Sequence, residues 1–395
     1  MRGMRRGMRC SVLIVAGLVA SGPALSATTK LTVETNYRLG YDTNPFLSAG
    51  SDLSATYVET GIAPKLVRQS EKGQVSLSGH FDRTAYLEKY GKADRYGGEL
   101  AAQQQVTPKL SVFAALRYDS GIIGQGNDNV TGNPADNPDV NLIGLRRRAD
   151  TYSASGGFQY QVGPKDTVSV DGGYTANRYR NGPPGNDSDN YGGRVGWQHA
   201  VSPRSKIGIS GSVYKIDYDT PGLSTLIMQP SVTFSSQLSQ SWTVDASLGV
   251  SFSDLSLPFT VVGAPRSANS TGLSGSLELC HTGAKDHFCF YGDRSVSASG
   301  AGGTVEQTQL GVNYRRALTE RVGFTWTGSY SRSKSQAGGL GTRQFVTGVA
   351  GLDWRVLRGL TIGAEGRYRD VYGQGFPVKA DIGGEVFARL QLTGR

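Results

Sequence analysis

Two cysteines near residue 285 have the spacing that most directly suggests covalent chemistry. Cys280 and Cys289 bracket a polar segment that holds His281 and His287. Both cysteines share parity with the polar side of the flanking alternating runs, so their thiols are expected to face each other across a hairpin. In an exported chain this arrangement favours a structural disulfide. The alternative is a metal site that adds the two histidines, but this spacing is not a standard zinc pattern, and we expect no bound metal.

A second pair with catalytic potential is His80 and Asp82, which lie on one side of a predicted strand. A hydrolase built on them needs a nucleophile or a positioned water, with a base and a group that orients the base. No serine motif identifies itself as the nucleophile. We therefore expect a protein that is not an enzyme, with no catalytic residue and no cofactor, and we retain a hydrolase as a third hypothesis.

Charged residues of both signs recur at alternating positions along the chain. Such a face is typical of a wall in contact with water, and we expect it to line a hydrated passage. Two explanations stay open: a specific track for a solute, or the ordinary lining of a water-filled bore. The lining candidates are Glu34, Arg38, Glu59, Lys65, Arg117, Glu365, Arg367 and Arg369.

The elements that must position these residues are predicted to be β-strands throughout. Apolar and polar residues alternate with period two over 31–41, 110–118 and 360–368, among other segments, and no stretch of the mature chain prefers the helical period. Each strand therefore has one apolar and one polar side.

Short and long connections alternate between these strands. Eight short turns, such as 107–109, and nine long loops, such as 42–52, separate eighteen predicted strands. The predicted fold is all-β: a transmembrane, antiparallel, up-and-down β-barrel of about 18 strands over residues 28–395. Of the longest loop, 120–150, we expect most to be a solvated surface loop, with an inward-folded constriction as the alternative.

A soluble sandwich or propeller also alternates, with its apolar side inward. Two features favour lipid instead. The apolar side carries almost no Lys or Glu, and its aromatic residues gather near strand ends, as Tyr41 and Tyr118 do at the long loops and Trp197 and Trp354 at the short turns. Rings at both ends form the two belts expected at the membrane interfaces. The expected location is the bacterial outer membrane, with its lipid and its assembly machinery as partners.

Composition and the N-terminus agree with export. Gly reaches 55 of 395 residues while Pro is only 15, which excludes collagen-like and Pro-rich disordered chains. Residues 1–27 combine four arginines, an apolar stretch and small residues, as a signal peptide does. Without those arginines the formal net charge falls from +9 to +5, so no nucleic-acid partner is expected.

Two short stretches resemble the β-barrel porins found with bacterial exopolysaccharide export systems. One is Gly40-Tyr41-Asp42-Thr43-Asn44-Pro45-Phe46, where the first strand ends in a Tyr-Asp-x-Asn turn; the other is the hairpin from Leu279-Cys280 to Phe288-Cys289. The resemblance implies an outer-membrane barrel associated with passage of a secreted polysaccharide and with periplasmic export proteins. The chain departs from many such barrels by ending on Leu392-Thr393-Gly394-Arg395 rather than on an aromatic residue.

Three hypotheses for function follow. The first is a passive conduit through which a secreted or capsular exopolysaccharide is exported. The alternative is a general or substrate-selective diffusion porin for small solutes, and the third is the barrel hydrolase. The sequence leaves open the transported molecule, its direction and the oligomeric state.

Overall fold

The computed structural model describes residues 27–123, 125, 143–144, 146–180, 187–257, 267–299, 303–335, 341–373 and 378–394. Of the predicted signal peptide, only Ala27 falls inside these ranges, so the signal peptide and its boundary stay a prediction. Across these ranges, no helix has both the length and the apolar character needed to cross a membrane.

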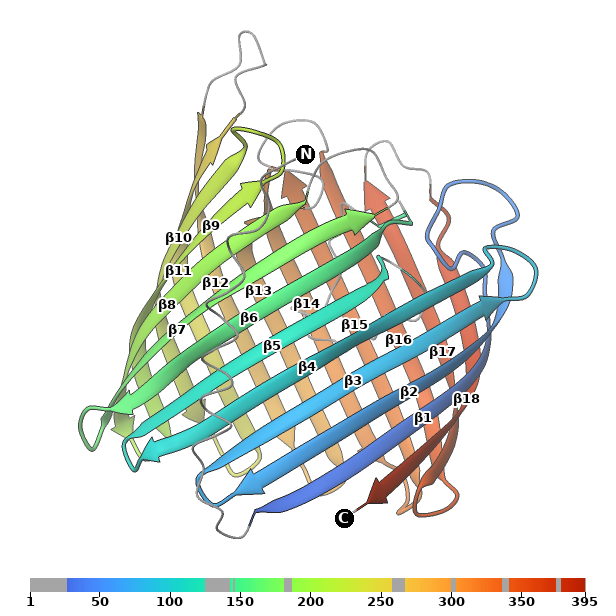
Figure 1. Ribbon diagram of the computed structural model, residues 1–395, viewed down its shortest axis with the longest axis horizontal. Helices are drawn as coiled ribbons and strands as arrows, with labels where there is room; N and C mark the ends of the chain where they lie inside the picture. Colours follow the sequence, from blue (N-terminus) through green and yellow to red (C-terminus); the bar gives the residue numbers. More distant parts are fainter. Residues whose placement is uncertain are drawn as a thin grey trace, which may run out of the picture.

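Eighteen antiparallel strands in the described ranges form one sheet in sequence order, and the pairing of the first strand with the last closes it into a barrel (Figure 1). The predicted fold is confirmed. The strands are β1 Thr28–Asp42, β2 Ala55–Ser70, β3 Gly73–Tyr86, β4 Lys92–Thr107, β5 Leu110–Ile122, β6 Arg148–Gln161, β7 Asp166–Arg180, β8 Ser188–Ser202, β9 Ser205–Tyr218, β10 Ser224–Gln237, β11 Trp242–Ser256, β12 Ser267–Thr282, β13 Asp286–Ala298, β14 Thr304–Ala317, β15 Val322–Ser335, β16 Thr342–Arg355, β17 Leu360–Gly373 and β18 Asp381–Gly394.

Closure and the apolar exterior have one physical cause. Hydrocarbon offers no partner for backbone N–H and C=O groups, so a spanning sheet must pair both edges of every strand. Large apolar side chains of the outward parity are exposed on this exterior, including Leu248 at 69%, Leu273 at 65% and Val232 at 61%. This exterior suits lipid acyl chains, and it defines the molecule as an outer-membrane β-barrel.

The strands are longer than a bilayer requires. They run from 13 residues in β5 to 16 in β2, whereas about 9 to 11 tilted residues span the hydrocarbon. Rings of Tyr96, Tyr118 and Tyr152 lie next to one another near the long-loop ends of β4, β5 and β6, with centroids 6.1 and 4.8 Å apart. Such a row of rings marks a membrane interface, so the strand ends beyond it extend into water.

One pair of neighbouring strands separates toward the long-loop end. β12 and β13 pair from Thr282 and His287 up to Gly275 and Arg294, while β12 continues beside β11 up to Ser267. The Arg294 guanidinium donates to the Leu273 carbonyl at 3.3 Å and pairs with Glu306 of β14 at 2.6 Å. Arg294 thus provides a donor for the β12 edge where the backbone ladder ends.

Candidate functional site in the barrel lumen

The strands that close the barrel carry an interior network of charges, which we call the seam cluster: Arg38, Asp42, Tyr57, Glu59, Arg367 and Glu385. They come from β1, β2, β17 and β18, where inward positions of adjacent strands stand opposite one another, as Arg38 does to Glu59. Arg38 binds Glu385 at 2.7 Å and lies 3.4 Å from Glu59. Buried charges are stable only when they are paired and hydrogen-bonded in this way.

The rest of the seam cluster is tied to Tyr57, which is fully buried. Its hydroxyl donates to Glu385 at 2.6 Å and accepts from Arg367 at 3.1 Å, and Arg367 also binds Asp42 at 2.7 Å. Gly40 stands opposite Tyr57 on β1, and a Cβ there would collide with the tyrosine ring. Glycine at this position therefore lets the ring lie against the wall.

The loop after β1 turns into the barrel mouth instead of away from it. The Asn44 backbone N–H donates to Asp381 at 2.7 Å, and the Asn44 side chain donates to the Lys379 carbonyl at 2.9 Å. Arg369 makes two hydrogen bonds to Asp381, at 2.8 and 3.1 Å, and a third to the Pro45 carbonyl at 2.9 Å. These contacts fix residues 43–45 against β17 and β18, and they give Asn44 of the Tyr-Asp-x-Asn turn a structural role.

The next two residues of this loop act as apolar anchors. Phe46 is 1% exposed and packs with Tyr57, Tyr86 and the partly buried Tyr90, with ring centroids 5.4 Å from Tyr86 and 5.1 Å from Tyr90. The Arg146 guanidinium lies over both the Phe46 and Tyr90 rings, 4.5 and 4.9 Å from their centroids. Burial raises the pKa of the Tyr90 phenol above its usual value.

Leu47 anchors the opposite side of the same loop. It is buried among Ile143, Phe345 and Val371, with a positive φ of 49°. A branched residue in that backbone region is strained and persists only where packing holds it. The loop therefore holds a fixed position at the mouth.

For the 120–150 loop, whose inward-folded constriction is the alternative prediction, only the two ends lie among the described residues. Ile143 and Arg147 are buried, and Gln125 donates to Thr84 of β3 at 3.1 Å. The middle of this loop lies outside the described residues. Its described ends therefore pack inward with the 43–54 loop.

The wall across the ring from the seam, β8 to β14, has a different chemistry. Serines face one another across strands: Ser210 and Ser231 at 2.8 Å, and Ser247 and Ser276 at 2.7 Å. Glutamines and the rings of Tyr214 and Tyr291 share the same inward face, around a recess of about 670 Å³. The charged positions of the sequence do not indicate this hydroxyl wall, although the alternating serines in 247–253 and 270–276 could have predicted it.

An apolar cluster lies at the long-loop end of this recess. Val296 packs against Ile216, Tyr218 and Ile227, and the Tyr218 hydroxyl donates to the Gly303 carbonyl at 2.5 Å. Val296 of β13 and Gly303 before β14 thereby lie against residues of the inner face of β9 and β10. The mouth is narrowed from two sides by described parts of the chain.

The structure places the predicted lining residues on the inward side but in different surroundings. Arg38, Glu59, Arg367 and Arg369 are tied into the seam or its loop anchor, and Glu365 is half-buried beside them. Glu34 pairs with Arg389 at 3.1 Å, whereas Lys65 and Arg117 are exposed. The buried residues of this set therefore stabilise the barrel as well as line its lumen. Asp42 and Asp381 were missing from that prediction, although Asp42 lies within the Tyr-Asp-x-Asn turn.

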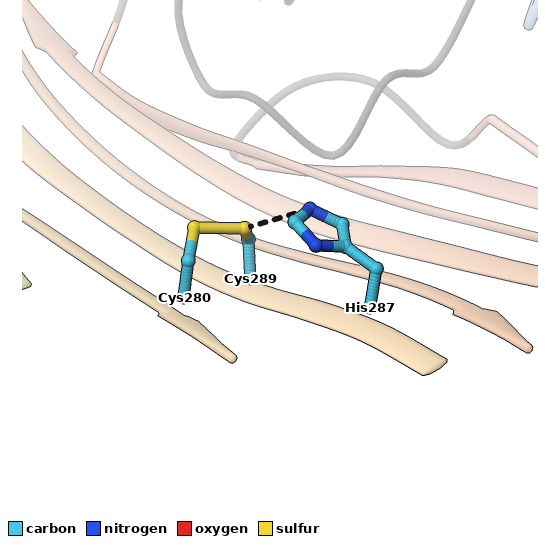
Figure 2. A group of neighbouring side chains, drawn as sticks. All are labelled: Cys280, His287 and Cys289. Carbon is cyan, nitrogen blue, oxygen red and sulfur yellow. Dashed lines mark hydrogen bonds between the residues drawn. A yellow bond between two sulfur atoms is a disulfide. The ribbon is translucent and has the colours of Figure 1, made fainter. Parts of the chain in front are cut away.

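Cys280 and Cys289 stand directly opposite each other on β12 and β13 and form a disulfide at the short-turn end (Figure 2). His287 lies beside them, with Nε2 3.3 Å from the Cys289 sulfur. The potential ligand atoms of these three residues lie within 4.8 Å of one another. Zinc binds cysteine as a thiolate, which these bonded sulfurs are not, so the oxidised hairpin is a structural link.

The pairing of His80 with Asp82 is wrong. His80 Nε2 instead lies 3.3 Å from Asp119 Oδ2, two strands away on β5. Gly97 of β4 stands between them, and a Cβ there would meet both side chains. Because Gly97 has no side chain, His80 can reach Asp119 across β4.

Comparison with solved structures supports the barrel fold. The ferric citrate transporter FecA in its unliganded form has a TM-score of 0.51 at 9% identity, over 93% of this chain and 78% of that chain. The FrpB iron transporter from Neisseria meningitidis has a TM-score of 0.47 at 8% identity. The match covers 87% of this chain and 63% of that transporter. Pseudomonas aeruginosa OpdL gives 0.46 at 10% identity, over 93% and 99% of the two chains. No protein-family model and no curated protein matches the chain, so the exopolysaccharide-export family stays a prediction.

Proposed function

We propose that this barrel is a diffusion channel for small hydrophilic solutes across the outer membrane. The observation that supports the proposal is the inner wall, which offers hydroxyl, amide and charged groups over many strands while the apolar side chains face outward. Multiple weak contacts of this kind let a solute enter and leave. Insertion by the outer-membrane assembly machinery is part of the same proposal.

Export of an exopolysaccharide is the second candidate, and the sequence resemblance favours it. Against it stand the inward-folded segment at 43–48 and the contact of Gly303 with Tyr218, which reduce the space for a polymer at the mouth. A channel narrowed by fixed segments suits small solutes better than a growing chain. We therefore place diffusion first.

The test uses the processed chain, purified in detergent and inserted into planar lipid bilayers and liposomes. We expect discrete ion-conductance steps and swelling of liposomes in small sugars. Conductance no higher than that of protein-free bilayers would refute the proposal. A gene deletion that abolishes polymer secretion and leaves small-solute permeability unchanged would favour export instead.

A further inference from the structure

The recess on the inner wall of β8 to β14 has the size and chemistry of a ligand site. Its volume of about 670 Å³ lies within the range of pockets that hold small molecules. It sits on the lumen side, below the apolar cluster around Val296. A solute that passes the mouth on this side meets the recess next.

The polar groups of the recess are mostly uncharged. A hydroxyl offers one donor and two acceptor sites, so a paired serine such as Ser210 or Ser231 keeps hydrogen-bonding capacity after bonding its neighbour. The amides of Gln229 and Gln309 add both donors and acceptors. Mixed donors and acceptors match the hydroxyl groups of a polyol, each of which also donates and accepts.

Two tyrosine rings supply apolar faces in this polar setting. Tyr214 stands opposite Gly192 of β8, where a Cβ would collide with the ring, so the ring lies flat on the wall. Tyr291 belongs to β13 and lines the same recess. A sugar ring has C–H faces that pack on an aromatic face while its hydroxyls reach the surrounding polar groups.

The charges of the recess disfavour an anion. Both signs are present, but Arg294 is already paired with Glu306, which leaves three carboxylates and Arg194, whose guanidinium donates to Ser210 at 3.1 Å. An anionic solute therefore meets net repulsion, whereas an uncharged solute does not. The charged lining residues are Arg194, Asp245, Glu278, Asp293 and Arg294.

We propose that this recess binds uncharged polyhydroxyl solutes, such as small sugars and polyols, and makes the channel selective for them; the inference rests on the proposed channel function. Binding is weak because the wall supplies many modest contacts. The seam cluster across the ring uses its charges internally and holds the mouth in shape.

The experiment records single-channel current in planar bilayers while sucrose is added, and compares glucose with gluconate as competitors because they share a carbon skeleton and differ in charge. We expect saturable sucrose-induced interruptions of the current, competition by glucose and none by gluconate. Tyr291→Ala should weaken sucrose binding about fivefold, the loss of one aromatic contact. Phe387→Ala, which removes an inward-parity ring on β18 that lines no part of the recess, should leave binding unchanged.

A second pair of variants, one in the recess and one outside it, keeps the test from depending on Tyr291→Ala alone. Gln229→Leu should weaken sucrose binding, whereas Gln103→Leu on β4 should not. An open channel that is indifferent to sucrose, equal losses in the recess and control variants, or gluconate competing as well as glucose would each overturn this inference while leaving the channel function intact. A protein that inserts but never conducts would overturn the channel function itself.

Discussion

Replacing Phe46 with alanine should release the 43–54 loop from the mouth without unfolding the barrel. Truncating a fully buried Phe costs about 3 to 5 kcal/mol, and Arg146 loses one of the two rings over which it lies. The strand ladder of β1 does not involve Phe46, so this cost falls on loop docking and not on closure of the sheet. A loss of about 3 kcal/mol raises the undocked fraction of the loop about 150-fold.

Two measurements detect the change. Single-channel conductance should rise because the mouth widens, and proteinase K should cut within 43–54 faster than in the wild type. The heat-induced shift in gel mobility, which reports barrel unfolding, should stay near the wild-type temperature. Phe113→Ala is the matched control, because its lumen-facing ring is 40% exposed and lies outside the Phe46 cluster.

Unchanged conductance and unchanged proteolysis in Phe46→Ala would refute the claim that this aromatic anchor holds the loop. Loss of the folded barrel would refute the separation of loop docking from closure. The residues that form the hydrogen bonds of Asn44 and Arg369 are unchanged in this variant, so the experiment tests the apolar contribution to docking.

Three further outcomes follow from the same structure. Leu248→Arg, on the outer face at the middle of β11, should lower the free energy of unfolding in lipid by about 2 to 4 kcal/mol, measured by urea titration. Ser247→Arg, on the inward face, should lower that free energy less, and equal losses would contradict a lipid-facing exterior. The double variant Cys280→Ser with Cys289→Ser should lose about 2 to 3 kcal/mol, and full retention of urea resistance would argue against a stabilising link. His80→Ala should leave channel conductance unaltered, and a loss of hydrolytic activity on replacing it would instead support the enzyme hypothesis.

The strand pattern was predictable because its cause is local. Side chains alternate across a strand whatever its neighbours are, so the segment 31–41 could be assigned an apolar and a polar side directly. Turn residues such as Pro108 and the long polar loops fixed the number of strands and the end at which each connection lies. The opposed cysteines followed from the same parity.

The site was harder to predict because its contacts join distant parts of the chain. Asp381 is hydrogen-bonded to Asn44, 337 positions away, and no period in the sequence links them. Gly97 shows the same limit at short range, since its missing side chain selects Asp119 over Asp82 as the neighbour of His80. The charged positions also give no indication of the serine wall, because its hydroxyl pairs form only where two serine-bearing strands are adjacent.

By itself the sequence determined an eighteen-stranded membrane barrel, since alternation and turn spacing are properties of neighbouring residues and hydrocarbon permits only a closed sheet. Only the tertiary structure decided that the first loop folds into the mouth and that the charges of β1, β2, β17 and β18 pair among themselves. These features arise when closure of the barrel brings the two ends of the chain together, because they depend on contacts between residues that are far apart in sequence.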